Sequence, residues 1–491
     1  MSTTNPITDI DLQKHFAKFK LRTLGNDHQV VSPYGKFPMV YADWIAEGRL
    51  YEPIENKIRE LAPFIANPHS YSSYTGKNIT RLYQEARQLI KLHVNASEND
   101  MLITTGHGMT GAMERFIKIL KNRFQWEELV SKNDRPVVFI THMEHHSNHT
   151  TWLQNGAEVV ILPAGKEGLV DPKILSQKLK KYQNRSVKIG SFSASSNVTG
   201  IITPYYKLAE IMHEEGGICV MDFAASAPYV NMNMHPKNKN AYLDAVLFAP
   251  HKFLGGPGTC GVLVINKSLH PGFPTISSGG NVKWTLPSGE YGVSDNLEQM
   301  EDNGTPAFIQ TIRTALAIHL KEEMQVELIH KREKQLMDRA FKRLKVIPEV
   351  SIMDGEVKAD RIGVVSFNIE GLHYNLVVRL LNDRFGIQTR GGWSCASNYA
   401  YHLFDYDLKG SKELIDRIKT GNMTGKPGWA RLSLHPTMSN EDLDYCLEAI
   451  EKLVEHGENW AKDYQYHPAD NEYYPVNSDI EEEREGNWFT C

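Results

Sequence analysis

The stretch AVLFAPHKFLGGPGTCG, residues 245–261, decides the fold and the chemistry of this 491-residue chain. Its apolar start, residues 245–248, predicts a buried strand, and Lys252 follows just after that strand ends. The glycines behind Lys252 let a ligand approach the backbone closely. Burial lowers the pKa of a lysine, and a neutral amine can attack an aldehyde. The alternative interpretation of Lys252 is a solvated lysine at a strand end.

Outward from this stretch, short apolar runs alternate with amphipathic segments from Pro33 to about Pro306. Strands are expected at residues 101–105, 137–141, 157–162, 188–192, 218–221, 245–248 and 261–265. Helices are expected at residues 110–123, 172–182 and 205–215. This alternation predicts an α/β fold with a mostly parallel sheet.

The length of the chain exceeds what one hydrophobic core usually supports, so two domains are expected. Segments at 363–369, 374–385, 429–434 and 440–456 indicate a second, smaller α+β domain. The predicted division is an N-terminal arm (1–32, with a helix at 9–21), a large cofactor-binding domain (33–308), a connecting helix (309–344), a small C-terminal domain (345–460) and an acidic, extended or partly disordered tail (461–491).

Composition excludes several classes of function. The net charge of −5 gives no reason to expect nucleic-acid binding, and no run approaches the roughly 18–20 apolar residues of a membrane helix. The N-terminus lacks the pattern of a signal peptide. Five scattered cysteines without a C-x-x-C pair indicate neither a zinc site nor a disulfide framework. We therefore expect a cytoplasmic protein without membrane or nucleic-acid partners.

Polar clusters follow four of the predicted strands, where ligands bind in open α/β sheets. Their sequences are THMEHHSN (141–148), SASSNVTG (193–200), DFAAS (222–226) and APHKFLGG (249–256). Asp222 could pair with the protonated ring nitrogen of pyridoxal 5′-phosphate (PLP), whose aldehyde Lys252 would bind. An N-cap or a salt bridge is the alternative for Asp222. Together the two residues predict a PLP site.

Further residues suit the same cofactor. His145 can stack on the ring and relay protons, and Asn197 can bind the phenolic oxygen unless it only forms a turn. Gly108, Met109 and Thr110 open a predicted helix whose N-terminus would bind the phosphate. The helical spacing of four histidines would also suit a metal site: His142, His145, His146 and His149. No acidic or cysteine cluster accompanies them, so no metal is predicted.

Seven motifs in order carry a resemblance to a known family. They are EHH (144–146), SNVTG (196–200), Asp222, HK (251–252), EDNGTP (301–306), RGGWSC (390–395) and WARLSL (429–434). From about residue 35 to 455 the chain resembles class V aminotransferase-fold PLP enzymes, and most of all cysteine desulfurases and selenocysteine lyases. The resemblance implies fold-type I architecture, a cofactor contact from His251, and a homodimer with a shared active site. In such dimers the segment matching Asn303, Gly304 and Thr305 reaches the partner's cofactor phosphate.

The resemblance also assigns the substrate site. Arg431, with Arg390 and Asn197, would bind the carboxylate of a small amino-acid substrate, because a guanidinium fork matches a carboxylate. Cys395 matches the sulfur-accepting cysteine of the R-x-G-x-x-C pattern. The implied function is removal of sulfur from L-cysteine to give alanine and a persulfide on Cys395, with a sulfur-acceptor protein as a further partner. The alternative for each arginine is a surface ion pair, and the alternative for Cys395 is a small residue buried in the core.

Several positions depart from the desulfurase pattern: Ala225 replaces a Gln or His, Ala249 replaces a Ser or Thr, and Trp393 and Ser394 replace two histidines. Ser195 or Ser226 could supply the missing contacts to the cofactor. These departures leave open an aminotransferase, a β-lyase or a kynureninase-like hydrolase, and also a non-catalytic scaffold of the same fold.

Overall fold

A seven-stranded sheet forms the centre of the computed structural model, which describes residues 9–476 except 107, 278 and 303. The strand order is β4-β10-β9-β8-β7-β5-β6, and in this sheet only β10 runs antiparallel to its neighbours. The mostly parallel α/β sheet is therefore confirmed. The strands are Asp100–Thr105 (β4), Val137–Thr141 (β5), Glu158–Leu162 (β6), Lys188–Ser193 (β7), Ile218–Asp222 (β8), Ala245–Phe248 (β9) and Gly261–Asn266 (β10).

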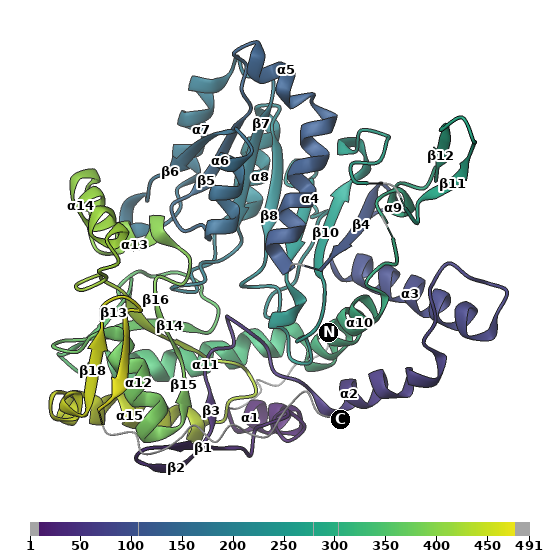
Figure 1. The fold of residues 1–491 in the computed structure, drawn as a ribbon. Coiled ribbons are helices and arrows are strands. Elements are labelled where there is room, and N and C mark those ends of the chain that lie inside the picture. The colour runs from purple at the N-terminus through teal and green to yellow at the C-terminus, as the bar shows by residue number, and fades with distance from the viewer. Residues whose placement is uncertain (1–8, 107, 278, 303, 477–491) are drawn as a thin grey trace, which may run out of the picture.

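Helices cover both faces of this sheet (Figure 1). Successive side chains of a strand point to opposite faces, so Val137 and Phe139 pack toward α7 and α8, whereas Val138 and Ile140 pack toward α4 and α6. Both faces are thus apolar, as a parallel sheet requires. The helices are Gly108–Arg123 (α4), Trp126–Ser131 (α5), Thr150–Gln154 (α6), Pro172–Leu179 (α7) and Tyr205–Glu214 (α8).

A second, four-stranded antiparallel sheet has the order β13-β14-β17-β16 and packs with α12 and α15 around its own core. The bounds are Val350–Ile352 (β13), Val364–Ile369 (β14), Arg390–Gly392 (β16), Trp429–Ser433 (β17), Tyr374–Phe385 (α12) and Asn440–Trp460 (α15). Near the N-terminus, β3 (Val40–Tyr41) pairs in parallel with β15 (Ile387–Gln388), and Ala42 lies in this second core. Part of the predicted large domain therefore packs with the small one, and the domain limits stay a prediction.

The connection between the two sheets differs from the single helix expected at 309–344. It consists of α10 (Phe308–Met324) and α11 (Val326–Leu344), separated at Gln325, whose φ of 63° is not helical. A residue with a positive φ ends one helix, and a new helix begins directly after it. The predicted single helix is therefore two helices interrupted at Gln325.

Near the N-terminus the structure contains the predicted helix, and near the C-terminus it differs from the prediction. The predicted N-terminal helix is present as α1 (Asp9–Lys20). The beginning of the predicted loose tail is ordered, because η7 (Ala461–Asp463) leads into a hairpin of β18 (Tyr464–His467) and β19 (Glu472–Pro475). Tyr464 is only 7% exposed and its hydroxyl donates to Asp383 Oδ2 at 3.1 Å. The rest of the predicted tail, residues 477–491, lies outside the described residues.

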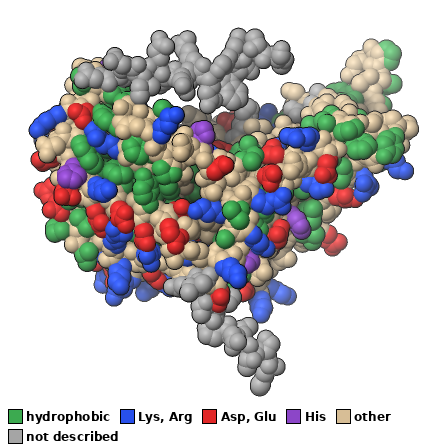
Figure 2. Space-filling view, turned by 90° about the horizontal axis from the view of Figure 1, so that it is seen from below, with side chains coloured by type: hydrophobic (Ala, Val, Ile, Leu, Met, Phe, Trp, Pro, Cys, Tyr) green, Lys and Arg blue, Asp and Glu red, His purple; other side chains and the backbone are tan. Residues whose placement is uncertain are grey.

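The remaining elements lie at the periphery. They are Gln29–Ser32 (β1), Gly35–Pro38 (β2), Glu52–Glu60 (α2), Tyr74–His93 (α3), Val282–Thr285 (β11), Tyr291–Val293 (β12), Leu297–Met300 (α9), Ser397–Leu403 (α13) and Leu408–Lys419 (α14). No helix among the described residues combines the length and apolar content that a bilayer crossing needs. Figure 2 shows acidic and basic side chains interspersed over one face of the molecule.

Candidate active site

The predicted site residues converge on one pocket of about 320 Å³ at the carboxyl ends of the parallel strands. Asp222 ends β8, Lys252 lies in the turn after β9, and Asn197 follows β7. Among the described residues that the sequence assigned to cofactor or substrate contacts, Ser226, Gly304 and Thr305 do not line it. Those that do are Gly108, Met109, Thr110, His145, Ser195, Asn197, Asp222, His251, Lys252, Arg390, Cys395 and Arg431.

Lys252 and Asp222 perturb each other in this pocket. Burial lowers the pKa of Lys252 to about 8, although the Asp222 carboxylate opposes that change. Burial likewise raises the pKa of Asp222 to about 7, while the Ala224 amide donates to Asp222 Oδ1 at 2.7 Å and opposes the rise. A lysine with this pKa has an appreciable neutral fraction near pH 7, as addition to an aldehyde requires.

His145 is held as a neutral imidazole. The Ser147 amide donates to its Nδ1 at 3.2 Å, so Nδ1 is an acceptor and the proton lies on Nε2. Burial lowers the pKa of His145 to about 4, with further lowering by the positive charge of Lys252. His145 can therefore donate a hydrogen bond or relay a proton through Nε2 without carrying charge.

The phosphate-binding residues predicted from the sequence lie together at the N-terminus of α4. Gly108 begins this 16-residue helix with a φ of +56°, a conformation that glycine adopts without strain. The backbone N–H groups of the first helical turn have no partners within the helix and suit an anion. His251 borders the same turn, and its Nδ1 lies 2.7 Å from Glu47 Oε2.

Buried polar atoms without partners test whether PLP fits. Among the described residues, neither Ser195 Oγ nor Asn197 Oδ1 has a hydrogen-bond partner, and both residues line the pocket. Buried polar groups are otherwise almost always paired, so these atoms mark contacts for a polar ligand. Ser226 Oγ also lacks a partner but does not line the pocket, which makes Ser195 the better replacement for the missing contacts. The residues present fit PLP.

The two predicted carboxylate-binding arginines meet at a residue that the sequence did not indicate. Asp43 Oδ2 accepts from Arg390 Nε at 2.9 Å, and Asp43 Oδ1 accepts from Arg431 Nη2 at the same distance. Arg431 is 2% exposed and also donates to the Asn197 carbonyl oxygen at 3.0 Å. Its Nε has no hydrogen-bond partner among the described residues. Asp43 thus orients both guanidinium groups, and Arg431 keeps a donor for a ligand.

Cys395 lies at the mouth of the pocket with its thiol exposed. Ser394 and Cys395 have φ angles of 51° and 56°, an uncommon left-handed pair that surrounding contacts hold in place. Asn197 Nδ2 donates to the Ser394 carbonyl oxygen at 2.7 Å, and the His146 amide donates to the Cys395 carbonyl oxygen at 2.7 Å. The thiol is therefore presented to the pocket on a pinned loop.

Two other histidines of the 142–149 segment contact the residues that follow the Cys395 loop. His146 Nε2 lies 2.7 Å from Ser397 Oγ, and His149 Nδ1 lies 3.1 Å from Asn398 Nδ2. Within the described residues no group of His, Cys, Asp and Glu has the geometry to hold a metal. These histidines instead join the large sheet to helix α13.

Glu144 is a second residue that the sequence did not single out for a role. Its carboxylate is buried and accepts hydrogen bonds from Thr141 Oγ1 (2.7 Å), Asn148 Nδ2 (2.7 Å) and the Ser193 amide (3.0 Å). Burial raises its pKa and these hydrogen bonds oppose the rise. By joining the ends of β5 and β7, Glu144 fixes the segment that carries His145.

Thr305 lies outside this pocket. It is exposed, its hydroxyl accepts from Asn67 Nδ2 at 3.2 Å, and it borders a separate cavity with Arg115 and Glu301. Asn303 lies outside the described residues. A cofactor contact from Thr305 within its own chain is therefore not formed, and a contact with a partner's cofactor stays a prediction.

Residues 43–446 match the sequence model of the family Aminotransferase class-V. The chain belongs to this family of PLP-dependent enzymes.

Two similar proteins and two similar solved structures are named cysteine desulfurases. A "Probable cysteine desulfurase" of Halalkalibacterium halodurans is 29% identical over 428 residues, which cover 85% of this chain and 94% of the relative. A "Probable cysteine desulfurase" of Staphylococcus epidermidis is 28% identical over 394 residues, which cover 79% of this chain and 86% of the relative. The apo cysteine desulfurase of Thermococcus onnurineus NA1 matches with a TM-score of 0.69 at 23% identity, covering 85% of this chain and 95% of the other. The cysteine desulfurase CsdA (S-sulfonic acid) of Escherichia coli matches with a TM-score of 0.68 at 20% sequence identity, and the match covers 90% of this chain and 98% of the other. These structures confirm the fold-type I architecture.

Proposed function

We propose that the protein is a cysteine desulfurase that removes sulfur from L-cysteine, giving alanine and a persulfide on Cys395. The observation that carries this proposal is the position of Cys395, whose thiol borders the same pocket as Lys252 and Asp222. The names of the relatives agree with it.

Different residues of the chain would bind the cofactor and the substrate. PLP, when bound, supplies an electron sink for the substrate Cα. Lys252 would bind its aldehyde, Asp222 its ring nitrogen, and the α4 N-terminus its phosphate. Arg431, oriented by Asp43, would bind the substrate carboxylate through its free donor. These contacts bring the substrate sulfur toward the Cys395 loop.

Proton and sulfur transfer follow from the remaining groups. Lys252, once its amine is released from the cofactor, would take the proton from the substrate Cα, and neutral His145 would relay a proton through Nε2. The Cys395 thiolate attacks the substrate sulfur, so an S–S bond forms while the substrate Cβ–S bond breaks. The electron pair of that bond stays with the carbon, and a proton completes the methyl group of alanine. A sulfur-acceptor protein would then receive the outer sulfur of the persulfide.

Alanine formation tests this proposal. The holoenzyme, incubated with L-cysteine and a reductant, should release alanine and sulfide in equal amounts. Cys395→Ala should lose both products and still show the absorbance change that L-cysteine causes in the bound cofactor. Full alanine release by Cys395→Ala would refute the role of this cysteine, and pyruvate in place of alanine would favour a β-lyase.

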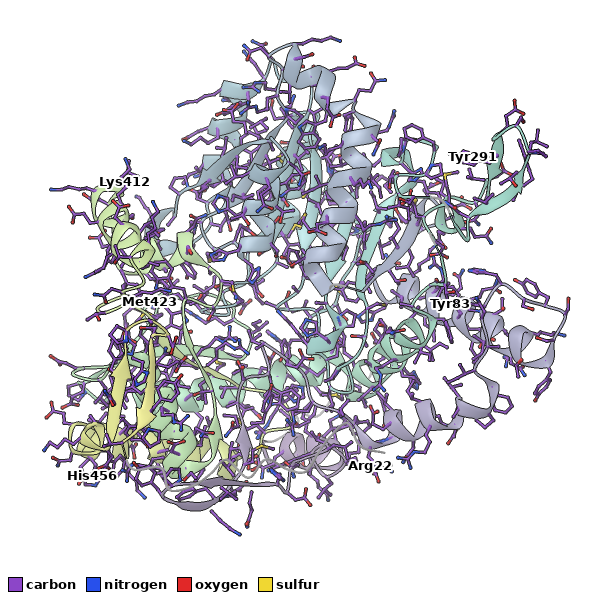
Figure 3. All side chains as sticks on the ribbon, viewed as in Figure 1. Arg22, Tyr83, Tyr291, Lys412, Met423 and His456 are labelled. Carbon is purple, nitrogen blue, oxygen red and sulfur yellow. The ribbon has the colours of Figure 1, made fainter. Side chains whose placement is uncertain are left out.

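We also propose a homodimer in which Thr305 contacts the partner's cofactor phosphate. Exposed apolar side chains support a covered surface, since Trp284 and Tyr291 lie largely exposed on the β11–β12 hairpin, which projects from the body (Figures 1 and 3). Sedimentation equilibrium should give twice the mass of the chain, and a monomer at micromolar concentration would refute the proposal. The free described cysteines fit a reducing compartment such as the cytoplasm.

A further inference from the structure

Two paired strands of the smaller sheet carry the arginines that would bind the substrate carboxylate. β16 and β17 run antiparallel, with Arg390 opposite Arg431 and Gly392 opposite Trp429. Alternate side chains of a strand point to the same face, so Trp429 and Arg431 lie on one face of β17. Arg431 lines the pocket. Trp429 is therefore the neighbour of Arg431 on the side of the strand that faces the pocket.

The chain turns sharply where β16 ends. Gly392, Ser394 and Cys395 have φ angles of 102°, 51° and 56°. Glycine adopts a positive φ freely, whereas for serine and cysteine this conformation is uncommon and persists only where surrounding contacts hold it. The place of the Cys395 thiol therefore depends on the contacts that hold this turn.

Ser394 makes two of these contacts. Its hydroxyl accepts from the indole Nε1 of Trp429 at 3.3 Å, and its carbonyl oxygen accepts from Asn197 Nδ2 at 2.7 Å. Trp429 is fully buried, and its ring is stacked with that of Phe404 at 6.0 Å between centroids. A buried indole N–H usually finds a hydrogen-bond acceptor, and here the acceptor is Ser394. Ser394 is thus held from β17 as well as from the pocket.

These contacts form a closed circuit beside the pocket. Arg431 Nη1 donates to the Asn197 carbonyl oxygen at 3.0 Å, and the Asn197 side chain donates to Ser394. Ser394 in turn accepts from Trp429, which stands on the same strand as Arg431. Cys395 follows Ser394 directly in the chain. The Cys395 thiol is therefore tied to the group that would bind the substrate carboxylate.

We propose that Ser394 and Trp429 are positioning residues that set the place of the Cys395 thiol relative to Arg431. The inference rests on the proposed attack of Cys395 on the substrate sulfur. A substrate bound by its carboxylate presents its sulfur within a limited region, so a displaced thiol reacts more slowly. Ser394 is one of the positions at which the chain departs from the desulfurase pattern. Its hydrogen bond with Trp429 gives this departure a role.

The test is a single turnover of the holoenzyme with L-cysteine, quenched at intervals, with mass spectrometry of the peptide that carries Cys395. Ser394→Ala should add sulfur to Cys395 about 3- to 10-fold more slowly, because the Trp429 indole loses its acceptor. The L-cysteine concentration that gives half of the cofactor's absorbance change should stay the same, since Arg431 is untouched. Ser131→Ala is the matched control, because it removes an exposed hydroxyl that donates to the Glu128 carbonyl oxygen at 2.8 Å, and it should behave as the unaltered protein.

Further variants separate position from other effects. Trp429→Phe removes the same hydrogen bond from its other end, so the double variant with Ser394→Ala should be no slower than Trp429→Phe alone. Ser394→Asn keeps an oxygen that can accept from the indole in a residue that tolerates the left-handed conformation, and it should retain most of the rate. The Ala396 amide donates to the Trp393 carbonyl oxygen at 2.9 Å, and its hydrogen exchange should become faster in Ser394→Ala with or without the cofactor.

Three results would overturn the inference. They are a sulfur-transfer rate in Ser394→Ala equal to that of the unaltered enzyme, additive losses in the double variant, and unchanged hydrogen exchange of the Ala396 amide. A rise in the half-saturating L-cysteine concentration as large as the loss of rate would also overturn it, because binding would then be impaired in place of position. No sulfur on Cys395 of the unaltered enzyme would refute the proposed function and the inference with it, and that result is seen before any variant is compared.

Discussion

The pKa of Lys252 gives the most quantitative prediction, because only the neutral amine can add to the aldehyde of PLP. Burial lowers this pKa from the ordinary value of 10.5 to about 8. At pH 7 the neutral fraction of an amine with a pKa of 8 is about one in ten, against about 0.03% for an ordinary lysine. The site should therefore accelerate cofactor addition about 300-fold near neutral pH through this effect alone.

The assay is stopped-flow absorbance after mixing apoenzyme with PLP at a series of pH values. The rate should rise with pH and level off above about pH 8, since a lowered pKa means that the amine loses its proton in that range. Nα-acetyllysine in place of the enzyme is the control, and its rate should keep rising toward pH 10. Asp222→Asn removes a charge that raises the pKa of Lys252, so its profile should level off at lower pH.

A rate that climbs steadily through pH 10 in the unaltered apoenzyme would refute the burial argument. A profile for Asp222→Asn that moves to higher pH would refute the pairing of the two residues. The first result would require a more solvated Lys252 than the pocket shows.

Three further changes probe the rest of the site. Arg431→Lys should raise KM for L-cysteine roughly 10- to 100-fold with a smaller change in kcat, because loss of a charged hydrogen bond costs about 1.5–3 kcal/mol. Binding of cysteamine, which has no carboxylate, should not change. An equal loss of affinity for both ligands would contradict this role of Arg431. Glu144→Gln should lower the melting temperature by several degrees, because both carboxylate oxygens of Glu144 accept hydrogen bonds and a glutamine keeps only one acceptor oxygen. The exposed Glu128→Gln should leave the melting temperature unchanged, and equal melting temperatures in the two variants would count against the network. Asn197→Ala should weaken PLP binding to the apoenzyme about 3- to 10-fold in a fluorescence titration, and an unchanged affinity would argue against its contact with the cofactor.

The large sheet and the centre of the pocket could be predicted from the sequence. The strands β8 and β9 are continuous apolar runs whose ends are visible in the sequence, and Asp222 and Lys252 stand at these two ends. Strand ends on the same side of a parallel sheet meet in space, which is why separate polar clusters could be assembled into one site.

Residues brought in from distant segments could not be found in this way. Asp43 contacts Arg431 from 388 positions away, and the strand before it, β3, has only two residues, too few to be recognised in the sequence. Lys426 lies over the ring of Trp393, and the Pro427 carbonyl oxygen accepts a hydrogen bond from the same indole, contacts that no local pattern encodes. Side chains of this kind are positioned by tertiary packing alone.

Two local features also escaped prediction. The break between α10 and α11 falls at Gln325, where neither glycine nor proline announces the end of a helix. The β18–β19 hairpin has a polar composition typical of a flank, yet a few contacts such as that of Tyr464 with Asp383 secure it. In both places the surroundings outweigh the local preference of the chain.

The most direct test of the account follows sulfur to its acceptor in a single turnover. The holoenzyme, mixed with one equivalent of L-cysteine without reductant, should yield one alanine per active site, and the peptide that carries Cys395 should gain the mass of one sulfur atom. Alanine formation with no sulfur added to Cys395 would contradict the account.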